Sequence, residues 1–167
     1  MNAHTSYVVD DKEKSIFMLD RAALVSNDVL RDEMQKIFAK CWIYVGHASE
    51  VKKPGDFVSR KVAGRPIILA RDQKGTVRCF LNTCRHRAAV VCLERAGNAR
   101  RFMCVYHGWV YNNDGTIARI PSDEAYSPAF DKSKLGLKSP AKFESYKDFW
   151  FMNLDPNSVD LKDRKST

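Results

Sequence analysis

Two short segments, Cys84-Arg85-His86 and Cys104-Val105-Tyr106-His107, decide how this chain folds and what it binds. Each segment pairs a thiol with an imidazole, and seventeen residues separate His86 from Cys104. With one residue between them, Cys84 and His86 can point to the same side of a loop. With two residues between them, Cys104 and His107 can do so where the loop makes a tight turn. Thiolates and imidazoles bind soft and borderline metals. The pattern therefore predicts one inorganic centre held between two loops.

Two kinds of centre fit this ligand set. One is a tetrahedral zinc site with two Cys and two His ligands. The other is a Rieske [2Fe–2S] cluster, in which two Cys hold one iron and two His hold the second. Zinc fingers usually place Cys with Cys and His with His, whereas each loop here carries one of each, so that each loop reaches both irons. The spacing favours the iron–sulfur cluster and leaves zinc as the alternative.

Sequence similarity extends well beyond the four ligands. The large (alpha) subunits of aromatic-ring-hydroxylating dioxygenases carry a Rieske signature that this chain resembles over residues 82–87, 97–99 and 104–109, with further likeness at 42–47 and 149–156. The chain departs from the family at Ala88, where Gly is common, and at Val105, where Pro is frequent. The resemblance covers most of the chain and concerns the N-terminal Rieske portion of such subunits.

The resemblance implies that Cys84, His86, Cys104 and His107 bind the cluster, which transfers one electron at a time. In this family the electron comes from a ferredoxin or reductase and passes to a mononuclear non-haem Fe(II), which activates O₂ to hydroxylate an aromatic substrate. That iron is expected only in a catalytic domain missing from this chain, so no catalytic residue is predicted here. The remaining catalytic domain and other alpha and beta subunits are the implied partners.

The other cysteines are predicted to be small core residues. Five cysteines and no secretory signal argue against a disulfide framework. Cys41, Cys79 and Cys92 lie in or beside apolar segments. High-potential Rieske proteins have an additional Cys in each loop, and the corresponding positions resemble Ala89 and Tyr106. The resemblance therefore implies the lower-potential, oxygenase-type branch.

The organisation predicted from the sequence has three parts: residues 1–41 as an N-terminal arm with an amphipathic helix, 42–157 as the Rieske domain, and 158–167 as a truncated linker. Residues 1–15 are polar and predict a loose arm. A helix is predicted from Asn27 to Cys41, because apolar residues recur on one face. These are Leu30, Met34, Ile37, Phe38 and Cys41.

Residues 42–157 predict a mainly β fold. Short aromatic and β-branched segments alternate with turn sequences, which is typical of an antiparallel sandwich or barrel. The predicted strands cover residues 42–46, 57–62, 65–71, 76–82, 101–103, 108–111, 116–118, 141–146 and 149–154. Both ligand loops are expected at the tips of hairpins, and residues 121–140 predict a long surface excursion.

The formal net charge is +8, and part of the excess lies within and between the ligand loops. These basic residues are Arg85, Arg87, Arg95, Arg100 and Arg101. They are interpreted either as a collar that steers an acidic ferredoxin or reductase, or as solvated surface. No nucleic-acid motif occurs and no apolar run reaches membrane-spanning length. Met1 to Asp10 lacks a secretory signal, which predicts a cytoplasmic protein without nucleic-acid or membrane partners.

Two other functions remain open at this stage. A free-standing, ferredoxin-like Rieske electron carrier would use the same cluster, although it would not need the N-terminal arm. A zinc-stabilised β domain that only binds partners would use the same four ligands. Iron, sulfide and zinc content distinguish the zinc domain from both iron–sulfur alternatives.

Overall fold

The computed structural model describes residues 6–164, which fall into two compact units, one up to Lys40 and the other from Cys41 onward. In the first unit, β1 (Val8–Asp11) and β2 (Ile16–Leu19) form an antiparallel hairpin, and α1 (Ala22–Val25) and α2 (Asn27–Lys36) follow. The prediction of a loose arm is wrong over the hairpin residues. His4 lies outside the described residues.

Helix α2 begins where the sequence predicts but ends early. The hydroxyl of Ser26 accepts hydrogen bonds from the backbone N–H groups of Asp28 and Val29, as an N-cap does. At the other end the Glu33 carbonyl accepts from both Ile37 and Phe38, and this doubled bond closes the final turn. The predicted extension to Cys41 is therefore wrong, because the apolar pattern continues past the end of the helix.

The second unit is built on a four-stranded antiparallel sheet. Its strands are β4 (Asp56–Val62), β5 (Arg65–Arg71), β6 (Val77–Leu81) and β7 (Ala96–Asn98), in the order β6-β5-β4-β7. Residues 67–70 of β5 are completely buried. Side chains alternate between the two faces of a strand. Ile67 and Leu69 consequently join one apolar core, and Ile68 and Ala70 join the other.

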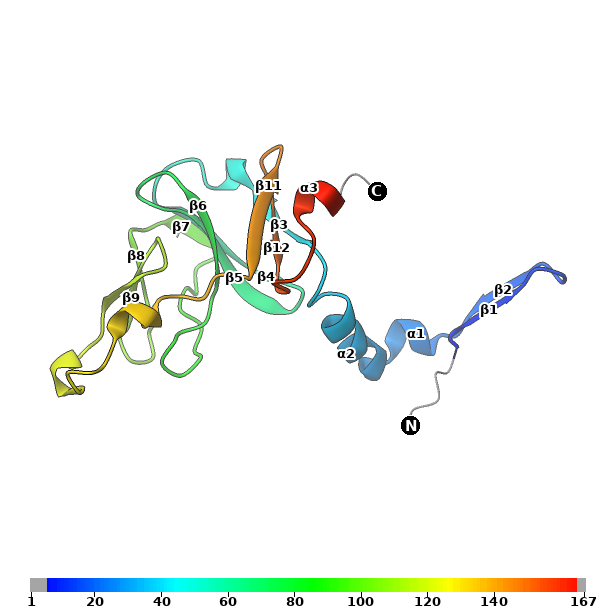
Figure 1. The fold of residues 1–167 in the computed structure, drawn as a ribbon, viewed down its shortest axis with the longest axis horizontal. Helices are drawn as coiled ribbons and strands as arrows, with labels where there is room; N and C mark the ends of the chain where they lie inside the picture. Colours follow the sequence, from blue (N-terminus) through cyan, green and yellow to red (C-terminus); the bar gives the residue numbers. More distant parts are fainter. Residues whose placement is uncertain (1–5, 165–167) are drawn as a thin grey trace. The chain divides into compact units, whose positions relative to one another are not determined.

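Two three-stranded sheets supply the partners for these cores. One has the order β10-β9-β8, from β8 (Arg101–Met103), β9 (Val110–Asn112) and β10 (Ile117–Arg119). The other has the order β11-β12-β3, from β3 (Ile43–His47), β11 (Lys142–Tyr146) and β12 (Phe149–Asn153). Figure 1 shows the central strands between these two groups. The predicted mainly β, antiparallel fold is confirmed, and the described sheets stay open and form no closed barrel.

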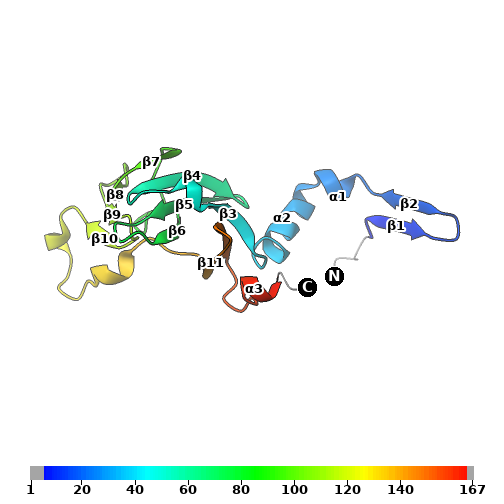
Figure 2. The same cartoon turned by 90° about the horizontal axis from the view of Figure 1, so that it is seen from above.

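Short helical turns complete the second unit. These are η1 (Ala48–Glu50), η2 (Asp123–Ala125), η3 (Lys132–Leu135) and α3 (Leu161–Arg164). Helix α3 lies against β11 (Figure 2), where the Leu161 N–H donates to the Glu144 carboxylate. Part of the segment predicted to be a linker therefore packs on the sheet. None of the helices among residues 6–164 combines the length and apolar character that a membrane crossing requires.

The β5–β6 hairpin is closed by a buried carboxylate. Asp72 is 1% exposed and accepts hydrogen bonds from the N–H groups of Lys74 and Thr76 and from Arg78 Nε, each at 2.9 Å. Burial by itself raises the pKa of Asp72, but the bonds from Thr76, Arg78 and Lys74 together outweigh it. The pKa therefore lies below its ordinary value. The hairpin depends on the charged form of this side chain.

We predict that Asp72→Asn lowers the free energy of unfolding by about 1–3 kcal/mol at pH 7, because a buried charged acceptor is lost. A depressed folded pKa stabilises the fold above the unfolded pKa of about 3.9, and this contribution is lost as the pH falls through the folded value. The difference in the free energy of unfolding between Asp72→Asn and the parent chain should accordingly stay constant from pH 7 to about pH 5. It should shrink below about pH 4. Urea unfolding at each pH measures it.

Asp114→Asn is the matched control. Asp114 also accepts a backbone hydrogen bond in a hairpin, from Thr116, but its side chain is exposed. The control should cost less than Asp72→Asn, since water can replace the lost bond. Equal losses in the two variants would contradict the role given to the burial of Asp72.

Candidate metal centre

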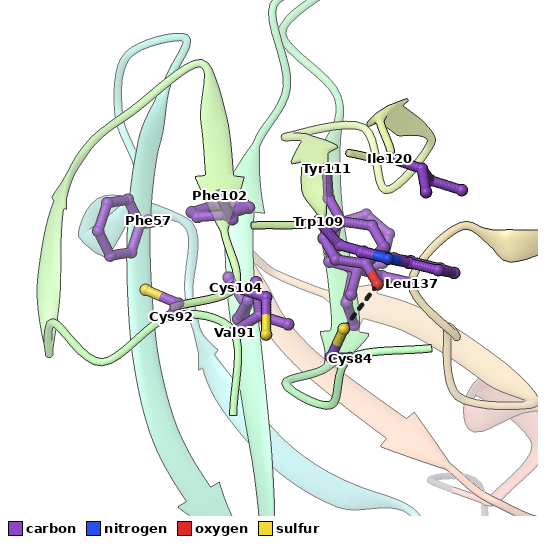
Figure 3. Packing of buried hydrophobic residues seen from close by; sticks show 13 residues of the cluster. Phe57, Cys84, Val91, Cys92, Phe102, Cys104, Trp109, Tyr111, Ile120 and Leu137 are labelled. Atoms are coloured by element: carbon purple, nitrogen blue, oxygen red, sulfur yellow. Dashed lines mark hydrogen bonds between the residues drawn. The ribbon is translucent and has the colours of Figure 1, made fainter. Parts of the chain in front are cut away.

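The four predicted ligands lie on two loops, one between β6 and β7 and the other between β8 and β9. Cys84 and Cys104 are buried at 4% and 1% exposure in the same apolar core cluster. Figure 3 shows the Cys84 thiol facing the Tyr111 hydroxyl, with Cys104 and Trp109 among the other residues of this cluster. His86 is half-buried and His107 is exposed. The site therefore has an apolar thiol side and a more accessible imidazole side.

The backbone of the first loop turns back on itself at Cys84. The Cys84 carbonyl accepts from the Ala88 N–H at 3.0 Å, and the Cys84 N–H donates to the Ala89 carbonyl at 2.7 Å. Ala88 adopts a φ of 58°, in the left-handed region that favours glycine. This chain has alanine at position 88, where the family that it resembles commonly has glycine. A methyl group therefore occupies a backbone position that favours glycine.

The second loop repeats this closure with a glycine in the turn. The Cys104 carbonyl accepts from the Gly108 N–H at 2.9 Å, and the Cys104 N–H donates to the Trp109 carbonyl at 2.8 Å. Gly108 has a φ of 69°, and a Cβ added there would lie 3.2 Å from Pro121. Both cysteines are thus fixed by the same pair of backbone bonds.

The side chain of Asn82, at the start of the first loop, forms hydrogen bonds with the backbone at the end of that loop. Its side chain is 1% exposed, and Oδ1 accepts from the N–H groups of Val91 at 3.0 Å and Cys92 at 2.8 Å. Its Nδ2 group donates to the Cys92 carbonyl at 2.7 Å and to the Ser59 hydroxyl at 3.1 Å. Because one buried side chain joins positions ten residues apart, the loop containing Cys84 and His86 has fixed ends.

The two imidazoles lie together. The ring centroids of His86 and His107 are 4.6 Å apart, and Trp109 stacks on His86 with its ring centroid at 5.2 Å and an interplanar angle of 5°. The Nδ1 atom of His86 is buried, and no residue described in the structure offers it a hydrogen bond. A buried nitrogen without a hydrogen bond is costly unless another partner binds it. A metal ion would be such a partner.

The protonation of His86 also fits a ligand role. Burial is the largest effect that lowers the pKa of His86, and the nearby positive charges of His107 and Arg87 lower it further. A lowered pKa favours the neutral imidazole, which is the form that binds metals. Of the other two histidines, the structure describes His47, which lies at a different place. His47 Nδ1 lies 2.8 Å from the Ser49 hydroxyl at η1, and His4 is outside the described residues.

Within residues 6–164, no three His, Cys, Asp or Glu side chains form a group suited to a single metal ion. The structure instead brings the two imidazoles together and places the two thiols in one core cluster. Cys79 and Cys92 are buried elsewhere in the two cores, and burial raises the pKa of these thiols to about 12 and about 11. Their role is packing.

Tyr111 lies beside a candidate ligand and was not among the residues predicted from the sequence. It is completely buried, and its hydroxyl lies 3.1 Å from Cys84 Sγ while it accepts the Arg85 N–H at 3.0 Å. Burial and the bond to Cys84 raise the pKa of Tyr111, so that the hydroxyl stays protonated and has a hydrogen to donate to sulfur. The available signal was the spacing of two aromatic residues two positions apart, since Trp109 and Tyr111 join the same core cluster.

We predict that Ala88→Gly raises the free energy of unfolding by about 1 kcal/mol, because glycine removes the strain of a left-handed backbone. Ala89→Gly is the control, since the next residue is outside the positive-φ region and glycine there should destabilise by about 0.5–1 kcal/mol. Urea unfolding measures both. Stabilisation by Ala89→Gly, or loss of stability in Ala88→Gly, would contradict the loop geometry.

Comparison with known proteins identifies the family of this chain. The family model of the Rieske [2Fe-2S] domain matches residues 41–140. The chain is 36% identical over 143 residues to the benzene 1,2-dioxygenase alpha subunit of Pseudomonas putida strain F1, an alignment that covers 86% of this chain and 32% of the relative. It is 41% identical over 152 residues to the N,N-dimethyl phenylurea N-demethylase alpha subunit of Sphingobium sp. strain YBL2, covering 87% and 33%.

Solved structures show the same relationship. The naphthalene 1,2-dioxygenase of Rhodococcus sp., solved with indole bound, superposes with a TM-score of 0.82 at 36% sequence identity, over 87% of this chain and 33% of that one. The chain thus spans about a third of the length of these relatives. It belongs to the Rieske [2Fe-2S] domain family and corresponds to the Rieske portion of an oxygenase alpha subunit.

Proposed function

We propose that Cys84 and Cys104 hold one iron of a Rieske [2Fe–2S] cluster and that His86 and His107 hold the other. The buried, unpartnered Nδ1 of His86, beside a second imidazole and near two buried thiols, carries this assignment. When bound, the cluster takes one electron from a reduced donor, which is thereby oxidised, and passes one electron on. The surrounding residues position the ligands and keep water from the thiol side.

Each surrounding residue has a definable task. Trp109 stacks on His86 and fixes the plane of its ring. Tyr111 donates toward Cys84 Sγ from inside the core, and Asn82 holds the ends of the first loop. The exposed His107 provides an accessible imidazole on the side away from the core. A rigid site of this kind changes little in structure when its charge changes by one electron.

In the whole protein, we assign this chain to the N-terminal part of an aromatic-ring-hydroxylating dioxygenase alpha subunit. Electrons from an acidic ferredoxin or reductase pass to a mononuclear non-haem Fe(II) outside this chain, for O₂-dependent hydroxylation of an aromatic substrate in the cytoplasm. Relatives named as benzene and naphthalene dioxygenases support an aromatic substrate. In this assignment residues 1–41 form the arm, 42–157 the Rieske domain and 158–167 the link to the catalytic region, with other alpha and beta subunits as partners.

The alternatives have less support. A free-standing carrier would resemble short Rieske ferredoxins, whereas the relatives named above are oxygenase alpha subunits about three times as long. A zinc domain needs four donors around one ion, an arrangement that the described residues do not show. The cluster assignment therefore remains the better account of the four side chains.

Metal analysis and EPR test the assignment. The reduced protein should contain two irons and two sulfides per chain and give a rhombic Rieske signal. Cys84→Ala and His107→Ala should each lose the signal, because each removes a ligand. Cys92→Ala is the control, since it removes a buried thiol of the same core that has no ligand role. Zinc in place of iron in the parent chain would exclude the proposed function.

We predict that Tyr111→Phe lowers the midpoint potential. A hydrogen bond to sulfur favours the reduced state, in which the ligand sulfur carries more negative charge. If this preference is about 1.4 kcal/mol, the potential falls by about 60 mV for a one-electron couple. Redox titration followed by EPR measures the change. Tyr106→Phe, which alters an exposed tyrosine next to His107, should leave the potential unchanged. Equal potentials in Tyr111→Phe and the parent would refute the role of this bond.

A further inference from the structure

The segment that follows β12 folds back onto the sheet that contains this strand. The Asp155 N–H donates to the buried side chain of Asn153 at 2.9 Å, and the Asn157 N–H donates to the Asp155 carboxylate at 2.9 Å. Side-chain oxygens that accept from a backbone N–H two residues on close tight turns. These turns bring residues 158–164 alongside β11, where α3 lies (Figure 1).

Two side chains of β11 hold the returning segment. Lys142 Nζ donates to the Ser158 carbonyl and, at 2.8 Å, to the Asp160 carboxylate. The Glu144 carboxylate accepts the Leu161 N–H at 3.0 Å, and the Leu161 side chain is buried at 6% exposure. Most of the other side chains of the segment are exposed. The segment is therefore ordered by bonds from the sheet and by the burial of one leucine.

A third contact comes from the opposite end of this unit in the sequence. The unit begins at Cys41, and the Nε1–H of the next residue, Trp42, donates to the Val159 carbonyl at 2.8 Å across 117 positions. Trp42 precedes β3, which pairs with β12. The place where the chain enters the Rieske domain and the place where it leaves are thus joined by one hydrogen bond.

We propose that Trp42, Lys142 and Glu144 form a latch that fastens residues 158–161 to the Rieske domain, so that the domain and its link move as one body. The inference rests on the proposed function, in which residues 158–167 are the link to the catalytic region. Transfer of an electron to an iron outside this chain requires a reproducible separation between the two centres. The three residues lie outside both ligand loops and act as positioning residues through the link.

The neutral contact of the latch is the one to test. In the Lys142–Asp160 pair the carboxylate side chain is 67% exposed, so that salt screens the attraction. The indole N–H of Trp42 is uncharged, and its side chain is half-buried. Trp42→Phe keeps an aromatic ring and removes this donor. It therefore isolates the bond between the entry and the exit of the domain.

Amide hydrogen exchange measured by NMR tests the latch. The Leu161 N–H is protected by its bond to Glu144, so its exchange rate reports how often the segment leaves β11. Trp42→Phe should speed this exchange about fivefold, the effect of one hydrogen bond. In the parent chain, backbone order parameters of residues 159–163 should match those of β11, at about 0.85. Values below about 0.6, or an unchanged exchange rate in Trp42→Phe, would overturn the inference.

Trp150→Phe is the matched control, because it makes the same chemical change in the same sheet. Trp150 stacks on Phe143 at the second core, and its buried Nε1 has no hydrogen-bond partner among the described residues. This variant should speed exchange of the most protected amides of β5 and leave that of Leu161 unchanged, since an open latch keeps its core. Equal acceleration of Leu161 exchange in both variants would also overturn the latch. EPR of the parent chain tests the proposed function separately, since a missing Rieske signal contradicts that function whatever the exchange rates.

Discussion

The burial of two cysteine side chains in one apolar cluster is the constraint on which the rest of this structure depends. A thiolate withdrawn from water is unfavourable unless a cation or a hydrogen bond compensates it. Cys84 and Cys104 are almost fully covered, and among the described residues the Tyr111 hydroxyl lies within hydrogen-bonding distance of Cys84 Sγ. The proposed metal centre would meet the remaining requirement. The two loops, with their repeated backbone closures, keep the sulfur atoms in place for it.

The proposed centre lies where two sheets meet. The first loop leaves β6 of the central sheet, and the second connects β8 and β9 of an outer sheet. The core between these sheets contains both thiols together with Phe57, Phe102 and Trp109. A cluster bound to both loops would link the sheets covalently through metal–ligand bonds, so metal binding and folding stability are coupled here. The second core, which contains Val45 and Met152, does not depend on the centre.

Local patterns in the sequence predicted the parts of the structure that local interactions determine. Cys and His spacing selected the four candidate ligands, whose role stays a prediction, and β5 follows from an apolar run bounded by turns. The hairpin β1–β2 was missed because its side chains are largely exposed and carry no burial pattern. Strand β7 was missed because it is three exposed residues long and exists through pairing with β4. Tyr111 reaches Cys84 through a contact between residues 27 positions apart, which no spacing rule reveals.

The two imidazoles have different surroundings. His86 is half-buried, stacked on Trp109 and bordered by a basic cleft, whereas His107 is exposed and contacts Tyr106 at a ring-centroid distance of 3.8 Å. The core covers the two thiols, so the accessible side of the proposed centre is its imidazole side. Positive charge near an imidazole disfavours its protonated form, and an exposed imidazole is better solvated than a half-buried one. The proposed centre would therefore have two chemically distinct edges within one rigid fold.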